Sequence, residues 1–264
     1  MQPGTARRTA HSRFSPTLAG MTAIDPAPWR GLQLVERVAG GHRNEVWRGD
    51  LDGRPVSVRR SRRSAASLAW ELDVIGRVGA AGVGVADVVA TDDGERSHDG
   101  VVVQHWIDGR PPTTDRHWHV VAETLRRVHA VPVGQRPEAV VVTELTEHSV
   151  SVDADVGALP PDVRRRVLEV FATFADAPVS LIHGDPNPSN IVVTDADRIV
   201  LLDWDESRVD VSWHDLSNLG VQVLDDETHA RAGRLSHAWE AVNAWTTEPD
   251  YARSRLARLH GGVA

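Results

Sequence analysis

A polar stretch followed by two β-type runs, residues 182–205 (IHGDPNPSNIVVTDADRIVLLDWD), constrains the fold of this 264-residue chain more than any other part of its sequence. The stretch begins with a loop of His, Asp and Asn residues, and the β-type runs follow at 191–193 and 199–202. Two short strands joined by a turn predict a hairpin. The open end of that hairpin brings Asn190, before the first strand, close to Asp203, after the second.

The loop and the hairpin together supply the groups that phosphoryl transfer from a nucleotide requires. Asp185 can orient a hydroxyl group and accept its proton, while the amide oxygen of Asn190 and the carboxylate of Asp203 can share one Mg²⁺ ion. The alternative is an acidic hairpin on the surface. We prefer the catalytic interpretation because His183, Asp185 and Asn190 occur together at these offsets, ahead of a hairpin that ends in Asp203 and Trp204.

The loop HGDPNPSN resembles the kinase catalytic loop H-R-D-L-x-x-x-N, and LLDWD occupies the place of the kinase D-F-G sequence. Gly184 replaces the arginine of protein kinases, and Asn187 stands where they usually carry lysine. The HGD form followed by DW is similar to the aminoglycoside phosphotransferase and choline kinase superfamily of small-molecule kinases. The order of predicted elements from about residue 32 to 259 agrees with this resemblance.

The resemblance implies a role for each polar residue around the hairpin. Asp185 is expected to be the catalytic base, and Asn190 and Asp203 are expected to be the metal ligands. His183 is expected to support the loop through hydrogen bonds. Asp215 is expected to support it from the start of a helix, where an acidic residue is also favourable electrostatically.

Residues 32–60 have the alternation and the breaks of a β-meander, which predicts an N-terminal antiparallel sheet. Gly40 and Gly41 lie in its first turn. The small-molecule kinases place the loop that covers the phosphates here, although a plain hairpin turn would use the same residues.

The run V-S-V-R in this sheet matches the kinase sequence V-A-I-K, so Arg59 takes the place of the lysine that binds the α- and β-phosphates. All 29 basic residues of the chain are arginine, and arginine binds phosphate well. A helix predicted over 64–78 carries Glu71 as the expected partner of Arg59. The alternative is that Arg59 and its arginine neighbours form a solvated basic patch.

Two further strands are predicted at 85–90 and 101–106, and the Gly and Pro residues after them indicate a boundary between two lobes. The resemblance implies that the nucleotide lies at this boundary. Backbone groups around Gln104 to Trp106 are then expected to meet the edge of the adenine ring.

We expect the chain to divide into a tail, an N-terminal lobe and a C-terminal lobe. Residues 1–28 are expected to be a disordered tail, which lacks the continuous apolar core of a secretory signal, and Met21 is an alternative start. Residues 29–106 are expected to form the nucleotide-binding lobe. Residues 107–264 are expected to form the catalytic and substrate-binding lobe.

Helical periodicity dominates the C-terminal lobe. His129, at the end of its first predicted helix, is expected to be a buried structural histidine, because no acid or nucleophile accompanies it in the sequence. The segment 132–159 gives no clear prediction. The predicted helices cover 118–129, 163–174, 228–246 and 251–259.

Composition excludes several other classes of protein. The chain has no cysteine, so it has neither a disulfide framework nor a thiolate metal site. It also has no apolar run near the roughly twenty residues of a membrane helix. A net charge of -8 argues against nucleic-acid binding. We expect a cytoplasmic protein with no nucleic-acid or membrane partner.

Negative charge is concentrated in the second half of the chain. Arginines number 14 against 12 acidic residues through Gln104, 9 against 14 in 105–202, and 6 against 11 from Asp203 onward. Because the acceptor in this fold lies against the C-terminal lobe, the balance favours a cationic acceptor such as an amino-sugar antibiotic. The acidic cluster 225–227 could contact its amines or only complement a helix N-terminus. Asp205 could contact a second metal ion or only solvent.

The sequence therefore predicts an α+β, protein-kinase-like fold with two lobes: an antiparallel sheet plus one helix, then a mainly helical lobe with the catalytic hairpin. The expected function is Mg²⁺-dependent phosphoryl transfer from ATP or GTP to a hydroxyl group of a small cationic molecule. One alternative is a kinase for choline, ethanolamine, homoserine or a sugar. Another is an inactive, nucleotide-binding pseudokinase, which the filled positions Asp185, Asn190 and Asp203 oppose.

Overall fold

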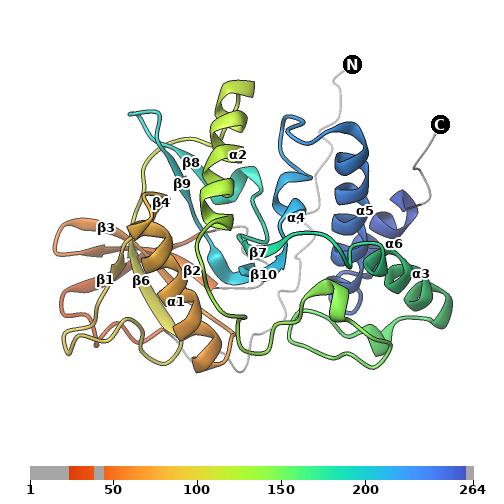
Figure 1. The fold of residues 1–264 in the computed structure, drawn as a ribbon. Helices are drawn as coiled ribbons and strands as arrows, with labels where there is room; N and C mark the ends of the chain where they lie inside the picture. The colour runs from red at the N-terminus through yellow and green to blue at the C-terminus, as the bar shows by residue number, and fades with distance from the viewer. Residues whose placement is uncertain (1–23, 39–44, 260–264) are drawn as a thin grey trace, which may run out of the picture.

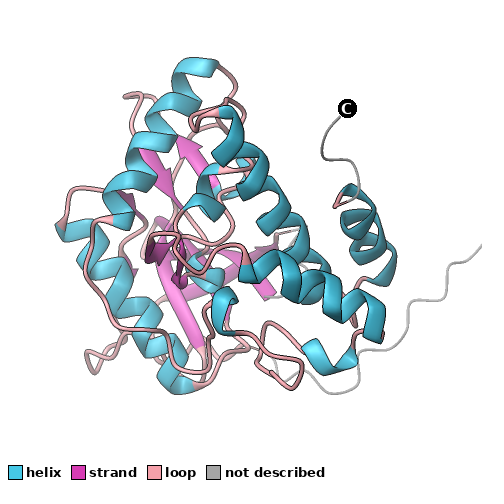
Figure 2. Ribbon diagram, turned by 45° about the vertical axis from the view of Figure 1, so that its right-hand side comes forward, coloured by secondary structure: helices cyan, strands magenta, loops and turns pink. Residues whose placement is uncertain are grey.

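The chain folds into two lobes, an N-terminal sheet with one helix and a larger lobe made mostly of helices (Figure 1). The computed structural model describes residues 24–38 and 45–259, so Gly40 and Gly41 lie outside the described residues. Figure 2 shows how helices make up most of the C-terminal lobe. The predicted fold class is confirmed.

The N-terminal sheet has the strand order β1-β2-β3-β6-β5, and all neighbouring strands are antiparallel. The β-meander predicted over 32–60 forms three of these strands. The five strands are β1 (Leu32–Arg37), β2 (Glu45–Leu51), β3 (Arg54–Arg60), β5 (Val88–Val89) and β6 (Val101–His105).

The two faces of this sheet bury different parts of the chain. On one face Val56 and Val58 of β3 pack with Ile24 and Trp29, which are 7% and 2% exposed. Ile24 falls within the expected disordered tail, so the packed part of the chain starts before residue 29. The side chain of Ile24 packs in the core of the sheet. The basic composition of the residues before it did not indicate this packing.

The other face of the sheet packs against helix α1 (Ala65–Ala80), where Val102 joins the same core as Leu68 and Leu72. Arg59 lies opposite Val102 in the register of β3 and β6. Side chains alternate along a strand, so Arg59 points to the α1 face while Val56 and Val58 point away from it. This is the orientation that the V-S-V-R pattern predicts.

The predicted catalytic hairpin consists of β8 (Ile191–Val193) and β9 (Ile199–Leu201), which are antiparallel. At its open end the amide of Leu202 donates to the carbonyl oxygen of Asn190 at 2.8 Å. Two more strands, β7 (Val179–Ile182) and β10 (Arg208–Val211), pair just before and after the hairpin in sequence.

The predicted strand 85–90 is wrong as a single element. Its start belongs to β4 (Gly84–Val85), which runs parallel to β9 of the hairpin, while β5 pairs with β6 in the N-terminal sheet. Gly84 permits the close approach to β9, because a Cβ atom there would lie closer than 3.0 Å to the carbonyl oxygen of Ile199. One short segment therefore connects both sheets.

Five α-helices form most of the described part of the C-terminal lobe, residues 107–259. None of the helices in 24–38 and 45–259 is long and apolar enough to cross a membrane. The helix α2 packs with the hairpin and α1 in one core, whereas α3 and α5 pack together in a second core. The helices are α2 (Asp115–His129), α3 (Pro161–Ala172), α4 (Trp213–Leu216), α5 (Asp226–Asn243) and α6 (Pro249–Arg258).

Gly84→Ala should destabilise the protein by about 1–3 kcal/mol, because the added methyl group must displace β4 from β9. Gly76→Ala is the matched control. Gly76 is exposed within α1 and a Cβ there meets nothing within 4 Å, so this change should stabilise the protein by up to about 1 kcal/mol. Urea denaturation of both variants measures the difference, and equal stabilities would contradict the close approach of β4.

Candidate active site

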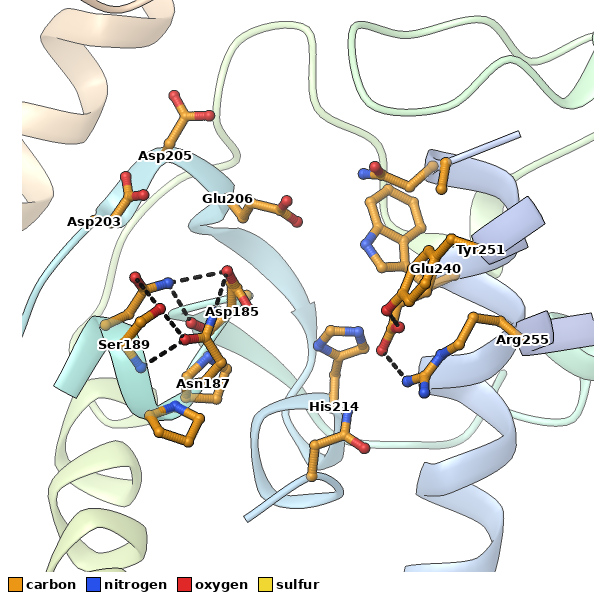
Figure 3. A pocket seen from close by; sticks show the side chains of 18 of the residues that line it. Asp185, Asn187, Ser189, Asp203, Asp205, Glu206, His214, Glu240, Tyr251 and Arg255 are labelled. Carbon is orange, nitrogen blue, oxygen red and sulfur yellow. Dashed lines mark hydrogen bonds and ion pairs between the residues drawn. The ribbon is translucent and has the colours of Figure 1, made fainter. Parts of the chain in front are cut away.

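The catalytic loop holds the carboxylate of Asp185 with two side-chain amides. The Nδ2 atoms of Asn187 and Asn190 each donate to Oδ2 of Asp185 at 2.9 Å, and Asn190 also donates to its backbone oxygen at 3.0 Å. Figure 3 shows these bonds at one side of the cavity. Because both amides bind Oδ2, the carboxylate is fixed in one orientation.

A buried carboxylate supports the backbone of this loop. Asp215, on α4, accepts hydrogen bonds from the amide of His183 at Oδ2 (2.8 Å) and from the amide of Gly184 at Oδ1 (2.9 Å), and Nε2 of His129 lies 3.0 Å from the same Oδ2. Burial alone would raise the pKa of Asp215, but the hydrogen bonds and charge of His129 outweigh it and lower that pKa to about 2. His129 thus has a structural contact in the site.

Gly184 is the residue that the local backbone requires at this position. Its φ is +90°, in the left-handed region, and a Cβ atom there would lie closer than 3.0 Å to the carbonyl oxygen of Glu206. The arginine that protein kinases carry here would not fit. The ring of the buried His183 reaches the hairpin, where its Nε2 lies 2.9 Å from the carbonyl oxygen of Leu202.

Asn190 and Asp203 lie at the open end of the hairpin and line the same cavity. Asp203 adopts a left-handed backbone conformation, with φ of +53°. Burial, with the charges of Asp205 and Asp185, raises the pKa of its carboxyl group although Arg59 lowers it. Asp203 is nevertheless exposed to solvent at the cavity, so a cation could reach its carboxylate and stabilise the charged form.

Arg59 forms an ion pair with Glu71, its predicted partner on α1, and both side chains are buried. Its Nη1 also lies 3.5 Å from Oδ1 of Asp205. The contacts of Asp205 are therefore not with solvent alone, which contradicts one of the two expected alternatives. Arg63 binds it as well, through Nε at 3.4 Å, and these arginines lower the pKa of Asp205 despite its burial.

The segment expected to meet adenine uses several of its donors within the sheet. The amides of His105 and Trp106 donate to the carbonyl oxygens of Asp87 and Pro55 at 2.9 and 3.0 Å, and the side-chain amide of Gln104 donates to Ala86. Adenine contacts through the amides of 105 and 106 are therefore not available in this geometry, because backbone pairing continues one residue past the end of β6 at His105.

A cavity of about 790 Å³ lies between the catalytic loop and the helices α4, α5 and α6. On its far side Glu240 of α5 binds Tyr251 and Arg255 of α6, while His214 lies between this group and Asp185 (Figure 3). Burial and the bond to Glu240 raise the pKa of Tyr251 to about 12. His214 is 5% exposed, and its ring nitrogens have no hydrogen-bond partner among the described residues.

The acidic cluster 225–227 does not belong to the described lining of this cavity. Asp225 instead caps α5 by accepting from the amide of Thr228 at 2.9 Å, which is the electrostatic alternative given above. Three acidic residues that no prediction named do line this cavity: Glu206, Glu240 and Glu248. Sequence analysis missed these residues because none of them belongs to a motif that the resemblance covers.

The fold and this site define a small-molecule kinase of the protein-kinase-like class. Residues 34–256 match the model of the phosphotransferase enzyme family APH, and the chain belongs to that family. Among curated proteins, none matches this sequence significantly.

Several solved structures share the fold at low sequence identity. A choline kinase from Streptococcus pneumoniae is 16% identical with a TM-score of 0.61, covering 86% of this chain and 94% of the other. An ethanolamine kinase from Plasmodium vivax is 14% identical with a TM-score of 0.60, covering 90% and 84%. A spectinomycin phosphotransferase, solved with ADP and spectinomycin, is 12% identical with a TM-score of 0.57, covering 87% and 89%.

Asp185→Asn should retain binding of the Mg²⁺–nucleotide complex but reduce kcat by about a hundredfold or more, because it removes the group predicted to be the general base. Asp203→Asn should instead weaken nucleotide binding and raise the Mg²⁺ concentration needed for activity. Calorimetric titration with Mg·ADP and steady-state kinetics separate the two. Equal nucleotide affinities and equal losses of kcat would refute these separate roles.

Asp215→Asn should lower stability most at neutral pH. A carboxyl group whose pKa falls from 3.8 to about 2 on folding contributes fully above pH 4 and loses its contribution as pH falls through 2. The contribution is on the order of 2 kcal/mol. The difference in unfolding free energy between the two proteins should therefore shrink from pH 5 to pH 2, and a constant difference would show that the charge of Asp215 is not what supports the loop.

Proposed function

We propose that this protein transfers the terminal phosphoryl group of ATP, or of GTP, to a hydroxyl group of a small amine-bearing molecule, with Mg²⁺ as cofactor. The observation that carries the proposal is the position of Asp185, held by Asn187 and Asn190 at the edge of the cavity. Asn190 both orients the base and lines the same cavity as Asp203.

The residues at the hairpin fit a magnesium ion. Within the described chain no group of three or more His, Cys, Asp or Glu side chains could hold a metal by itself. Mg²⁺ in kinases takes only one or two protein ligands and completes its shell with phosphate oxygens and water. Asn190 and Asp203 would be these ligands, and the ion would neutralise charge on the phosphates.

The transfer assigns one role to each polar group. The acceptor hydroxyl donates a hydrogen bond to Asp185, and its oxygen forms a bond to the γ-phosphorus as the bond from that phosphorus to the β,γ-bridging oxygen breaks. The hydroxyl proton passes to Asp185, and the nucleoside diphosphate leaves. Arg59 would bind the phosphates, as the resemblance to V-A-I-K implies.

The lining of the cavity supports a cationic acceptor. Six of its residues are acidic and one, Arg255, is basic. Glu240 is already paired with Arg255, and Asp205 with Arg59 and Arg63. Asp185, Glu206 and Glu248 add further negative charge to the walls, which concentrates cations by focusing the field.

A second candidate is a kinase for a simple amino alcohol, which the choline and ethanolamine kinases among the similar structures favour. The pseudokinase alternative remains opposed by the complete set of Asp185, Asn190 and Asp203. The assay is release of ADP with aminoglycosides, spectinomycin, choline, ethanolamine, aminopropanol and neutral sugars, followed by phosphorus NMR of the product. A protein that binds Mg·ADP but phosphorylates none of them would support the binding module instead.

The KM of the best amine-bearing acceptor should rise several-fold between about 0.05 and 0.5 M salt, since the Debye length falls from above 10 Å to a few Å. A neutral sugar tested as acceptor under the same conditions is the control, because its KM should change much less. A best acceptor that is neutral or anionic, with KM independent of salt, would refute the cationic assignment and leave the kinase assignment intact.

A further inference from the structure

Arg136 belongs to none of the predicted motifs, yet it is 2% exposed and makes a dense set of contacts with helix α1. Its Nε donates to Oγ of Ser67 at 2.6 Å, and its Nη2 donates to Oε2 of Glu71 at 3.2 Å. Its guanidinium carbon lies 5.7 Å from the ring centre of Trp70. These three residues share one face of α1, because they are spaced three and four positions apart.

The other side of the Arg136 guanidinium binds the turn that follows the hairpin. Its Nη1 donates to the carbonyl oxygens of Asp205 at 2.5 Å and Ser207 at 3.1 Å. This turn starts directly after Asp203. Arg136 therefore connects the helix that carries Glu71 with the backbone next to the proposed metal ligand.

The backbone at Arg136 is fixed independently of α1. The side chain of Gln135 donates to the carbonyl oxygen of Val209 at 2.9 Å and accepts from its amide at 3.0 Å, as a neighbouring strand would. The same Gln135 oxygen accepts from the amide of Arg136 at 2.9 Å. Strand β10 thus sets the position from which Arg136 reaches α1.

Glu71 is completely buried, and its two oxygens bind different arginines: Oε1 binds Arg59 and Oε2 binds Arg136. A carboxylate can bind one guanidinium with both oxygens, which is a strong geometry for this pair. Arg136 prevents that arrangement by occupying Oε2. The other terminal nitrogen of Arg59, Nη1, lies 3.5 Å from Oδ1 of Asp205, which lines the cavity.

We propose that Arg136 is a positioning residue of the nucleotide site, which keeps Arg59 directed toward the phosphates by occupying the second oxygen of Glu71. In its absence Glu71 binds Arg59 through both oxygens, and the guanidinium turns toward α1. The inference rests on the proposed function, because it requires nucleotide phosphates at Arg59. Arg136 itself contacts no substrate in this scheme.

The test is the affinity for Mg·ADP, measured by calorimetry on the full chain together with the temperature of unfolding. Arg136→Met should raise Kd about tenfold, a change of about 1.4 kcal/mol in binding free energy. Arg136→Lys should also raise Kd, because one ammonium group cannot reach Ser67, Glu71 and the two carbonyl oxygens together. Glu71→Gln should raise Kd too. The double variant Arg136→Met/Glu71→Gln should have a Kd close to that of the weaker-binding single variant, because both changes act on the same contact.

Arg208→Lys is the matched control. Arg208 is also 2% exposed, and its Nε binds Asp210 at 2.8 Å, so the change removes a similar buried ion-pair geometry. It should lower the unfolding temperature but alter the Kd for Mg·ADP by less than about twofold. If Arg136→Met does not fold, Gln135→Ala perturbs the same position more gently and should raise Kd in the same direction.

Two outcomes separate this inference from the proposed function. Arg136 variants that unfold at lower temperature but bind Mg·ADP as tightly as the wild-type protein would show a purely structural role and overturn the inference. In that case weaker binding by Glu71→Gln would leave the proposed function standing. A wild-type protein without affinity for Mg·ADP would overturn both.

Discussion

The buried carboxylate of Asp215 is the interaction on which the geometry of the site depends. It accepts hydrogen bonds from two backbone amides of the catalytic loop and contacts His129 at the end of α2. Asp215 therefore connects α4, α2 and the loop. Without this support the loop backbone, and Asp185 with it, would be less firmly positioned. Position matters because phosphoryl transfer requires reacting atoms within a few tenths of an ångström of a productive geometry. The tight backbone at Gly184 follows from the same support, because it brings the loop beneath the carbonyl oxygen of Glu206.

Sequence analysis predicted the parts of the structure that depend on local patterns. The β-meander, the catalytic hairpin and the long helices follow from alternation and helical periodicity, and the Arg59–Glu71 pair lies within adjacent predicted elements. Arg136 could not be predicted in this way, because it lies 65 residues from Glu71 in a segment without periodicity. The same applies to Arg63, which binds Asp205 across 142 residues. The split of 85–90 between two sheets depends on a close backbone approach at Gly84, which local pattern does not encode.

The structure indicates the type of reaction more closely than the identity of the acceptor. The reaction depends on the hairpin, whereas the acceptor depends on the far wall of the cavity. The hairpin presents the same polar groups whatever the acceptor, whereas α4, α5 and α6 form the far wall of the cavity. Counting charges along the sequence overstated the acidity of that wall, since Tyr251 and Arg255 occupy the oxygens of Glu240. Similar folds at 12–16% identity serve choline, ethanolamine and spectinomycin in other proteins, so fold alone does not identify the acceptor here.

The guanidinium at Arg59 also changes the chemical reactivity of the proposed nucleotide site. An amine at this position could lose its proton and react with acylating reagents or aldehydes, but a guanidinium stays protonated at any pH that the folded protein would survive. Burial alone would lower the pKa of Arg59, but the charges of Glu71, Asp203 and Asp205 outweigh it and raise that pKa still further. Since every basic side chain of the chain is arginine, nucleotide analogues that label kinases by acylating a lysine would have no side-chain amine to modify. Surveys that detect ATP-binding proteins through such labelling would overlook this protein even when its site is fully occupied.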